Sequence, residues 1–175
     1  MKSVIIYGSQ YGFSKRYAEE LGELTGVVTY SYDVAPGLSS CDQIVYVGGL
    51  YAGNMTGFKE FAKTLPQDVK LILVTVGLMN PENKDYTDKI QAGLRKKLPQ
   101  DLQNNVQFFH LRGGIDYGPM SRTHKMMMGA LCAALKTKPA AKRGVDENLV
   151  IDSYQKEIDL TDFKTLAPIV EAMKE

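Results

Sequence analysis

One stretch of the sequence decides the fold: Val4-Ile5-Ile6-Tyr7-Gly8-Ser9-Gln10-Tyr11-Gly12-Phe13-Ser14-Lys15. An apolar run typical of a buried strand leads into a turn rich in hydroxyl groups and glycine, and the amphipathic residues that follow predict a helix. This order aims unpaired backbone N–H groups and the positive end of the helix dipole at a single point. The turn therefore suits a phosphate group, with Ser9 and Ser14 as candidate hydroxyl donors.

The same turn excludes two common nucleotide-binding motifs and leaves one simpler alternative open. It contains neither the Gly-x-Gly-x-x-Gly of dinucleotide-binding folds nor the Gly-Lys-Ser/Thr of nucleotide triphosphatases. A small monophosphate ligand is therefore favoured. The alternative is a capped junction between strand and helix, in which Ser9 or Ser14 serves only as the N-cap.

Length and composition indicate one globular domain covering residues 1–175, with 44% hydrophobic and 23% charged residues. Cys41 and Cys132 match no metal or redox spacing, and no signal peptide is recognisable, so we expect a protein of the reducing cytoplasm without a metal site. No apolar run approaches the roughly 20 residues that span a bilayer. Nucleic-acid binding is not expected, because the basic residues are not interleaved with aromatic ones.

Short apolar runs alternate with helical patterns along the chain, which is typical of a parallel sheet with crossover helices. The predicted strands are Ser3–Tyr7, Val27–Tyr32, Gln43–Gly48, Leu71–Val76 and Val106–Leu111. The predicted helices are Phe13–Leu24, Thr56–Thr64, Lys84–Lys97 and Thr161–Met173. This pattern predicts an α/β three-layer sandwich around a five-stranded parallel sheet of order 2-1-3-4-5.

Ligands of such sheets bind beyond the carboxyl ends of the strands, where three loops of this chain are expected to meet. These loops are Gly8–Phe13, Gly48–Met55 and Gly77–Asn83. The first suits a phosphate, and Tyr51 in the second suits a planar ring. A ligand with a phosphate and an aromatic ring indicates flavin mononucleotide (FMN).

Three segments carry a resemblance to a known family: the Ser-x-x-Gly-x-Ser turn at 9–14, Phe58-Lys59-Glu60-Phe61, and residues 111–153. The chain resembles the flavodoxin superfamily, and within it the flavodoxin-domain family that includes menaquinone-dependent protoporphyrinogen dehydrogenase. The resemblance implies a flavodoxin-like fold and FMN as cofactor. The cofactor-binding residues that it implies are Ser9, Gln10, Tyr11, Gly12, Phe13, Ser14, Gly49, Leu50, Tyr51, Ala52, Val76, Gly77, Leu78, Met79 and Asn80.

Two departures from the flavodoxin pattern affect the expected function. Tyr11 stands where flavodoxins commonly have threonine, and the third loop, Gly77-Leu78-Met79-Asn80-Pro81, has no carboxylate. Because an acidic rim disfavours anionic reduced flavin, its absence predicts a less negative potential and an oxidase-like role. Tyr11 also leaves open a flavin-free scaffold of the same shape.

An insertion over residues 112–160 separates the fifth predicted strand from the last predicted helix. Between Gly118 and Val145 it carries six basic residues and no acidic one, and ten uncharged residues run from Met126 to Leu135. One interpretation is an added helix packed on the core, its methionines filling gaps. The other is a Met-rich basic wall around a large apolar, anionic substrate, or a surface in peripheral contact with the inner face of the membrane.

The predicted function is that of an FMN-dependent oxidoreductase, protoporphyrinogen dehydrogenase-like, which passes electrons from an apolar substrate to a quinone or other acceptor. The alternative is an electron carrier that docks a protein redox partner and has no substrate of its own. The candidate proton-transfer residues are His110, Tyr117 and His124. The candidate substrate-binding residues are Arg112, Tyr117, Arg122 and Lys125.

Overall fold

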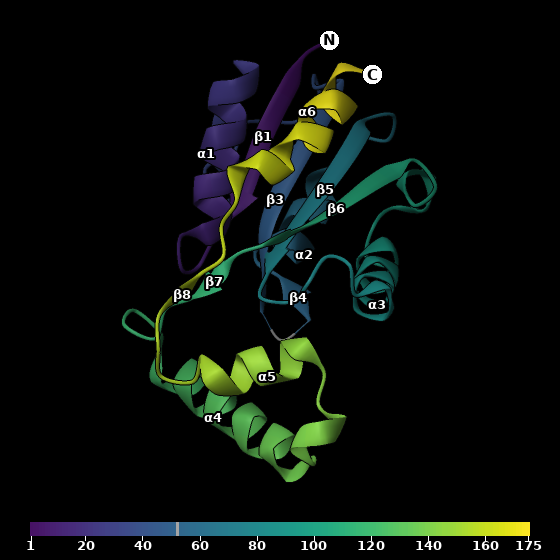
Figure 1. The fold of residues 1–175 in the computed structure, drawn as a ribbon. Helices are drawn as coiled ribbons and strands as arrows, with labels where there is room; N and C mark the ends of the chain where they lie inside the picture. Colours follow the sequence, from purple (N-terminus) through teal and green to yellow (C-terminus); the bar gives the residue numbers. More distant parts are fainter. Residues whose placement is uncertain (52) are drawn as a thin grey trace.

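A parallel sheet of five strands forms the centre of the molecule in a computed structural model that describes residues 1–51 and 53–175 (Figure 1). The five strands are β1 (Ser3–Gly8), β2 (Thr29–Ser31), β3 (Gln43–Tyr51), β5 (Lys70–Gly77) and β6 (Val106–Arg112). Their spatial order is β2-β1-β3-β5-β6, and all four pairings are parallel. The predicted order 2-1-3-4-5 and the flavodoxin-like fold are therefore confirmed.

Side chains that alternate along the strands divide the core between the two faces of the sheet. Ile5, Val45 and Ile72 lie on the face covered by α1 (Phe13–Thr25) and α6 (Ala167–Lys174). Their sequence neighbours, such as Ile6 and Tyr46, lie on the opposite face with α2 (Phe58–Phe61) and α3 (Lys84–Arg95). Because the central strands are buried on both faces, their sequences are continuously apolar rather than alternating.

The predicted helices exist, but two of them are broken into shorter pieces. The helix expected at Thr56–Thr64 is α2 followed by the 3-10 turn η1 (Ala62–Thr64), because the chain first forms β4 (Asn54–Met55), which pairs antiparallel with the end of β3. The helix expected at Thr161–Met173 is η4 (Phe163–Leu166) followed by α6, which has a proline in its first turn. A further 3-10 turn, η2 (Gln100–Leu102), precedes β6.

The insertion leaves the sheet after β6 and forms a helical pair of its own. It comprises β7 (Gly114–Ile115), α4 (Arg122–Thr137), η3 (Ala140–Lys142), α5 (Val145–Asp152) and β8 (Ile158–Asp159). Figure 1 shows α4 and α5 beyond the carboxyl ends of the strands, at the opposite end of the molecule from the two termini. The chain enters and leaves the pair through β7 and β8, which are antiparallel neighbours. The added helix thus packs on α5 rather than on a face of the sheet.

Within residues 1–51 and 53–175, no helix combines the length and the apolar character needed to cross a membrane.

Candidate functional site

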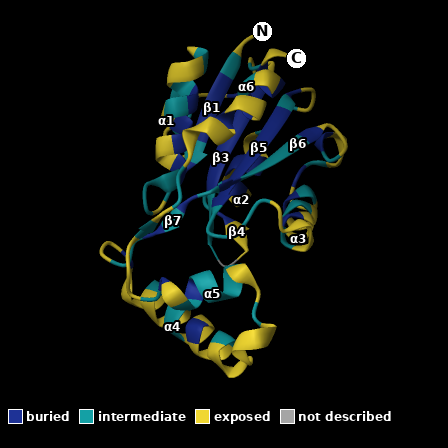
Figure 2. Cartoon of the chain, viewed as in Figure 1, coloured by how far each residue is buried: buried dark blue, intermediate teal, exposed yellow. Residues whose placement is uncertain are grey.

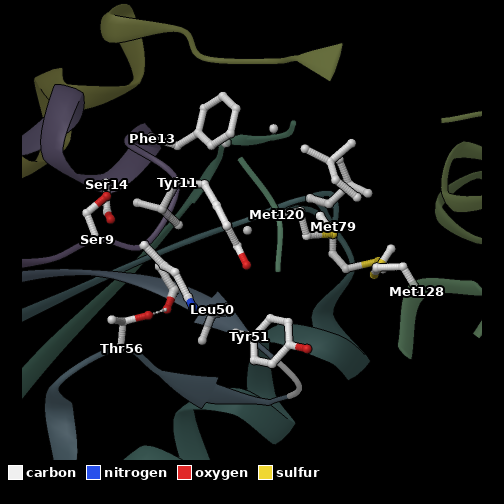
Figure 3. A pocket seen from close by; sticks show the side chains of 18 of the residues that line it. Ser9, Tyr11, Phe13, Ser14, Leu50, Tyr51, Thr56, Met79, Met120 and Met128 are labelled. Atoms are coloured by element: carbon white, nitrogen blue, oxygen red, sulfur yellow. Dashed lines mark hydrogen bonds between the residues drawn. The ribbon is translucent and has the colours of Figure 1, made fainter. Parts of the chain in front are cut away.

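A cavity of about 430 Å³ lies between the carboxyl edge of the sheet and the helical pair (Figure 3). The three predicted loops supply its floor, and α4 and α5 supply its roof. The lining residues are Ser9, Gln10, Tyr11, Phe13, Ser14, Gly49, Leu50, Tyr51, Gly53, Thr56, Val76, Gly77, Leu78, Met79, Tyr86, Gly113, Gly114, Ile115, Met120, Met127, Met128, Leu131 and Val150. The wall is polar near the start of α1 and apolar elsewhere.

The polar end of the cavity is built by the turn between β1 and α1. Gly12 is the N-cap of α1 with φ at 95°, and no described side chain caps that helix end, so its first N–H groups stay available to an anion. Ser9 Oγ accepts the Gly12 N–H at 3.1 Å, which leaves the Ser9 hydroxyl proton free. Ser14 Oγ donates to the Gly8 carbonyl at 2.8 Å, so its proton is already used.

The first two loops touch one another, and this contact requires glycine at position 8. A Cβ atom there would lie 2.0 Å from the carbonyl oxygen of Thr56, which is closer than any real contact. Thr56 in turn closes the second loop, because its N–H and its hydroxyl both donate to the Gly49 carbonyl, at 2.9 and 3.0 Å. Tyr46 fixes the carbonyl of Thr56 from below with a 2.6 Å bond. The loop that carries Tyr51 is thus held against the turn between β1 and α1.

The first turn of α4 contacts both loops through His124. Its ring stacks on that of Tyr51, with centroids 3.8 Å apart and planes inclined by 28°. Its Nδ1 atom is hydrogen-bonded to the Tyr11 hydroxyl, and the Tyr51 hydroxyl donates to Met127 Sδ at 3.0 Å. Burial raises the pKa of Tyr11, and hydrogen bonding by Ser121 opposes that rise. The insertion is therefore attached to the cavity by an aromatic cluster.

The third loop is held from beneath by His110. The Nε2 atom of His110 lies 3.2 Å from the Met79 carbonyl, and Nδ1 lies 2.8 Å from the Thr75 hydroxyl. Burial lowers the pKa of His110, and the hydrogen bond to Met79 opposes that change. The ring also meets Tyr86 edge to face, with centroids 5.6 Å apart. His110 thus supports two residues of the cavity wall, Met79 and Tyr86, from behind.

The same loop is held from above by a carboxylate of the insertion. Both side-chain oxygens of Asp146, in the first turn of α5, accept the Asn80 N–H, at 3.1 and 3.2 Å. Arg112 donates to the Leu78 carbonyl at 3.2 Å and lies 3.8 Å from Asp146. Residues 77–81 of the loop contain no carboxylate, but the fold places Asp146 against them from 66 residues away.

Most of the predicted cofactor residues meet at this cavity. Those that line it are Ser9, Gln10, Tyr11, Phe13, Ser14, Gly49, Leu50, Tyr51, Val76, Gly77, Leu78 and Met79. Gly12 and Asn80 do not line it, since Gly12 caps the helix behind the turn and Asn80 points its N–H at Asp146. Ala52 lies outside the described residues.

The predicted proton-transfer and substrate residues are more scattered. His124 contacts the cavity wall through Tyr11 and Tyr51, while Tyr117 packs edge to face on Tyr154, with centroids 5.8 Å apart, and lines no part of the cavity. Arg122 and Lys125 are exposed on α4 and do not line the cavity. The guanidinium of Arg112 is engaged by the third loop and Asp146.

The lining of the cavity includes residues that the sequence indicated only as a group, and others that it did not indicate. Met127, Met128 and Leu131 belong to the uncharged run that suggested a Met-rich wall. Tyr86 and Val150 come from α3 and α5 and had no local signal, because their role depends on how distant helices pack. In the described part of the chain, no group of three or more His, Cys, Asp or Glu side chains is placed to hold a metal ion.

Comparison with known proteins identifies a family that fits this geometry. A family model described as a flavodoxin domain matches residues 4–141, which include the turn between β1 and α1 and, apart from Ser3, all five strands of the parallel sheet. No curated protein matches the sequence.

Several solved structures are similar in outline at low sequence identity. A flavodoxin from the domain Archaea is 15% identical, with a TM-score of 0.44, and the match covers 89% of this chain and 97% of that one. A flavodoxin mutant from Fusobacterium nucleatum bound to FMN is 14% identical, with a TM-score of 0.41 and coverage of 67% and 79%. An NAD(P)H:quinone oxidoreductase from Methanothermobacter marburgensis is 10% identical, with a TM-score of 0.43 and coverage of 87% and 96%.

Proposed function

This chain belongs to the flavodoxin domain family, and from that premise we propose that it binds FMN and acts as an FMN-dependent oxidoreductase on an apolar substrate. The observation that carries the proposal is the cavity at the carboxyl edge of the sheet. It joins the turn at the uncapped start of α1 to an apolar chamber, and the insertion covers it. Its volume of about 430 Å³ falls within the usual range of small-molecule sites, about 300–1,000 Å³.

The residues of the cavity fit FMN at both of its ends. The phosphate is assigned to the uncapped start of α1, where the Ser9 hydroxyl adds a donor and the backbone N–H groups of the first turn converge. The flavin ring is assigned to the apolar part of the wall, between the loop of Leu50 and Tyr51 and the loop of Leu78 and Met79. The backbone N–H of Tyr11 remains at the turn. Its side-chain hydroxyl bonds to His124 and therefore does not replace the hydroxyl of the threonine that flavodoxins commonly have there.

When bound, FMN supplies the redox chemistry, and the protein supplies binding, orientation and exclusion of water. The roof formed by Met127, Met128 and Leu131 keeps the chamber apolar. Tyr11 and His124 are directly hydrogen-bonded at the wall, so a proton released or taken up in the chamber is exchanged through the pair of Tyr11 Oη and His124 Nδ1. Asp146 and Arg112 fix the third loop against the ring position.

The covered chamber favours an enzyme over an electron carrier. A carrier transfers electrons through a flavin edge that is open to a protein partner, whereas here α4 and α5 lie over that side of the sheet (Figure 1). The apolar roof favours an apolar substrate, with a quinone or a similar molecule as acceptor. The narrower assignment, a protoporphyrinogen dehydrogenase-like reaction, gains no support from the comparisons and stays a prediction.

The cofactor is tested by titrating the purified apoprotein with FMN and with riboflavin while following flavin fluorescence. We expect one equivalent of FMN to bind, at least tenfold more tightly than riboflavin, because only FMN carries the phosphate. Absence of FMN binding would overturn the assignment.

The enzyme and the carrier are distinguished with the FMN-loaded protein. Bound flavin is photoreduced, and its reoxidation is followed with a short-chain quinone and with cytochrome c as acceptors at equal concentration. We expect faster reoxidation by the quinone, because a small apolar acceptor enters the covered chamber and a protein acceptor does not. Equal or faster reoxidation by cytochrome c would indicate an open flavin edge and thus a carrier.

A further inference from the structure

The helix α4 carries large apolar side chains that remain exposed although part of the helix roofs the cavity. Met126 is 70% exposed, and Met127 and Leu131 are 42% and 43% exposed. The helical spacing places Met126, Ala130 and Ala134 along the same outer side, and all three are exposed. Figure 2 shows how much of α4 and of the turn after it is exposed. Large side chains of this kind on one helix face mark a surface that contacts something else.

Unpaired cations lie beside this outer face, which we define as Met126, Met127, Ala130, Leu131 and Ala134. Arg122 and Lys125 lie in the first turns of α4, Lys136 in its last turn, and Lys142 in η3. All four side chains are exposed, and within residues 1–51 and 53–175 none of the four pairs with a carboxylate. The surface therefore combines apolar side chains with free positive charge.

The other two basic residues between Gly118 and Val145 already have partners within the chain. Only four of the six cations are therefore available to an external partner. Lys138 forms an ion pair with Glu147 at 2.8 Å. Arg143 donates to the carbonyl oxygens of Leu135, Lys136 and Lys138, at the carboxyl end of α4. The sequence alone does not separate the two groups.

The charge pattern argues against a second copy of the chain as the occupant of the outer face. Between Gly118 and Val145 the sequence has no acidic residue, so two outer faces brought together would oppose cation to cation. An occupant that complements both properties carries negative charge at its surface and apolar groups just beneath. A bilayer with anionic lipids has this arrangement.

We propose that the outer face of α4 binds the surface of an anionic lipid bilayer. The 16-residue helix, about 24 Å long, lies flat on the bilayer, with Met126, Ala130 and Ala134 toward the boundary between headgroups and acyl chains. Arg122, Lys125, Lys136 and Lys142 contact lipid phosphates beside that line. Met127 and Leu131 also line the cavity, so the chamber opens beside the bound bilayer and receives apolar molecules from it. The binding itself does not require the cofactor.

The experiment is co-sedimentation of the full chain with vesicles of phosphatidylcholine alone and of phosphatidylcholine with 30% phosphatidylglycerol, at 0.1 M and 0.5 M NaCl. We expect binding to the anionic vesicles at low salt, with at least tenfold weaker binding at high salt and to the neutral vesicles. Equal binding to both vesicle types, or no binding, would overturn the proposal.

Two variants test the two components of the surface, and each has a matched control. Met126→Glu on the outer face is compared with Leu24→Glu, an exposed apolar residue (56%) in the last turns of α1 at the opposite edge of the sheet. We expect at least a tenfold loss of binding from the first and less than a twofold change from the second. The charge variant replaces Arg122, Lys125 and Lys136 by glutamine, and its control replaces the exposed Lys59, Lys89 and Lys96.

Self-association of the chain through the outer face is the alternative that must also be tested. The mass in solution is measured by light scattering between 10 and 100 µM for the parent chain and Met126→Glu. We expect a monomer for both. A dimer that Met126→Glu dissociates would place a second copy on the outer face and overturn the bilayer assignment. All variants replace exposed side chains, and thermal melting confirms that each one folds.

Discussion

Both carboxylate oxygens of Asp146 accept a hydrogen bond from the backbone N–H of Asn80, at 3.1 and 3.2 Å, although the two residues are 66 positions apart in the sequence. This is a contact between the insertion and a loop of the parallel sheet, and it lies at the edge of the cavity. The Asp146 side chain is only 12% exposed, and Arg112 is its cationic neighbour. The insertion is therefore part of the cavity wall and not an appendage of it.

We expect Asp146→Asn to lower the free energy of unfolding by about 1–3 kcal/mol, because the Asn80 N–H and Arg112 both lose a charged, largely buried acceptor. The amide keeps the shape but leaves Arg112 without a counter-charge. Urea denaturation measures the change. Asp152→Asn, on an exposed residue of the same helix, is the control and should differ from the parent by less than about 0.5 kcal/mol. Equal changes in the free energy of unfolding for the two substitutions would contradict a stabilising role of the bond between Asp146 and Asn80.

Ser9 and Ser14 should affect flavin binding differently, because only Ser9 has a free hydroxyl proton. We expect Ser9→Ala to weaken FMN binding about tenfold, or about 1.4 kcal/mol, and to change riboflavin affinity less than threefold. Ser14→Ala should weaken the two ligands by similar factors, because it loosens the turn through the lost bond to Gly8. Calorimetric titration with both flavins measures the four affinities. Equal losses for FMN and riboflavin in Ser9→Ala would remove Ser9 from the phosphate site.

His110 makes stability depend on pH. Because burial lowers its pKa, the folded protein binds fewer protons than the unfolded chain when the pH falls below about 6.5, the ordinary histidine pKa. The stability contribution is thus complete above pH 6.5 and is lost as the pH falls through the folded-state pKa. We expect the parent to lose stability between pH 7.5 and pH 5.5.

His110→Gln is the matched variant for that prediction, since the amide of glutamine offers one donor to Met79 and one acceptor to Thr75 without titrating. Urea denaturation at the two pH values should show a smaller loss for the variant than for the parent. The same loss in both proteins would assign the pH dependence to other groups.

The carboxylate of Asp159 in β8 should make a smaller contribution to the pH dependence of stability, at lower pH than His110. Hydrogen bonding from Thr161 and from the Arg16 guanidinium, opposed by burial, holds the pKa of Asp159 at about 2. Its contribution is present above the unfolded pKa of about 3.9 and is lost as the pH falls through about 2. Because the Arg16 and Asp159 side chains are 45% and 42% exposed, solvent screening limits the contribution to about 1 kcal/mol or less.

Asp159→Asn tests this by thermal melting at pH 7 and at pH 2. We expect the variant to melt slightly below the parent at pH 7 and to approach it at pH 2, where about half of the parent carboxylates are protonated and most of the contribution is lost. An undiminished difference at pH 2 would show that the substitution acts through packing rather than charge.

The sequence predicted the sheet because its signals are local. Ile5 and Ile6 lie on opposite faces, and both are buried, so the run from Val4 to Ile6 shows the fully buried strand directly. The turn from Ser9 to Ser14 likewise carries its own signal, since its glycines and hydroxyls act on neighbouring backbone groups.

What the sequence did not show depends on contacts between distant segments. Tyr11 and His124 are 113 residues apart, and nothing near either residue indicates that they bond. The strands β4, β7 and β8 have two residues each, which is too short for any periodicity. The placement of α4 beyond the sheet was also unpredictable from its composition, because an apolar run is equally consistent with a core helix and with a roof.

The pairing of β7 with β8 sets the two ends of the helical pair side by side, at Gly114 opposite Asp159 and Ile115 opposite Ile158. A segment whose ends already meet can be lengthened, shortened or exchanged in evolution without a change in the spacing of the strands that support it. The junction thus separates the strand spacing of the flavodoxin-like base from the length of residues 116–157, which contact that base again through His124 and Asp146. A related chain with the same parallel sheet but a different segment between β7 and β8 would keep the loops that form the floor of the cavity and would have a different roof.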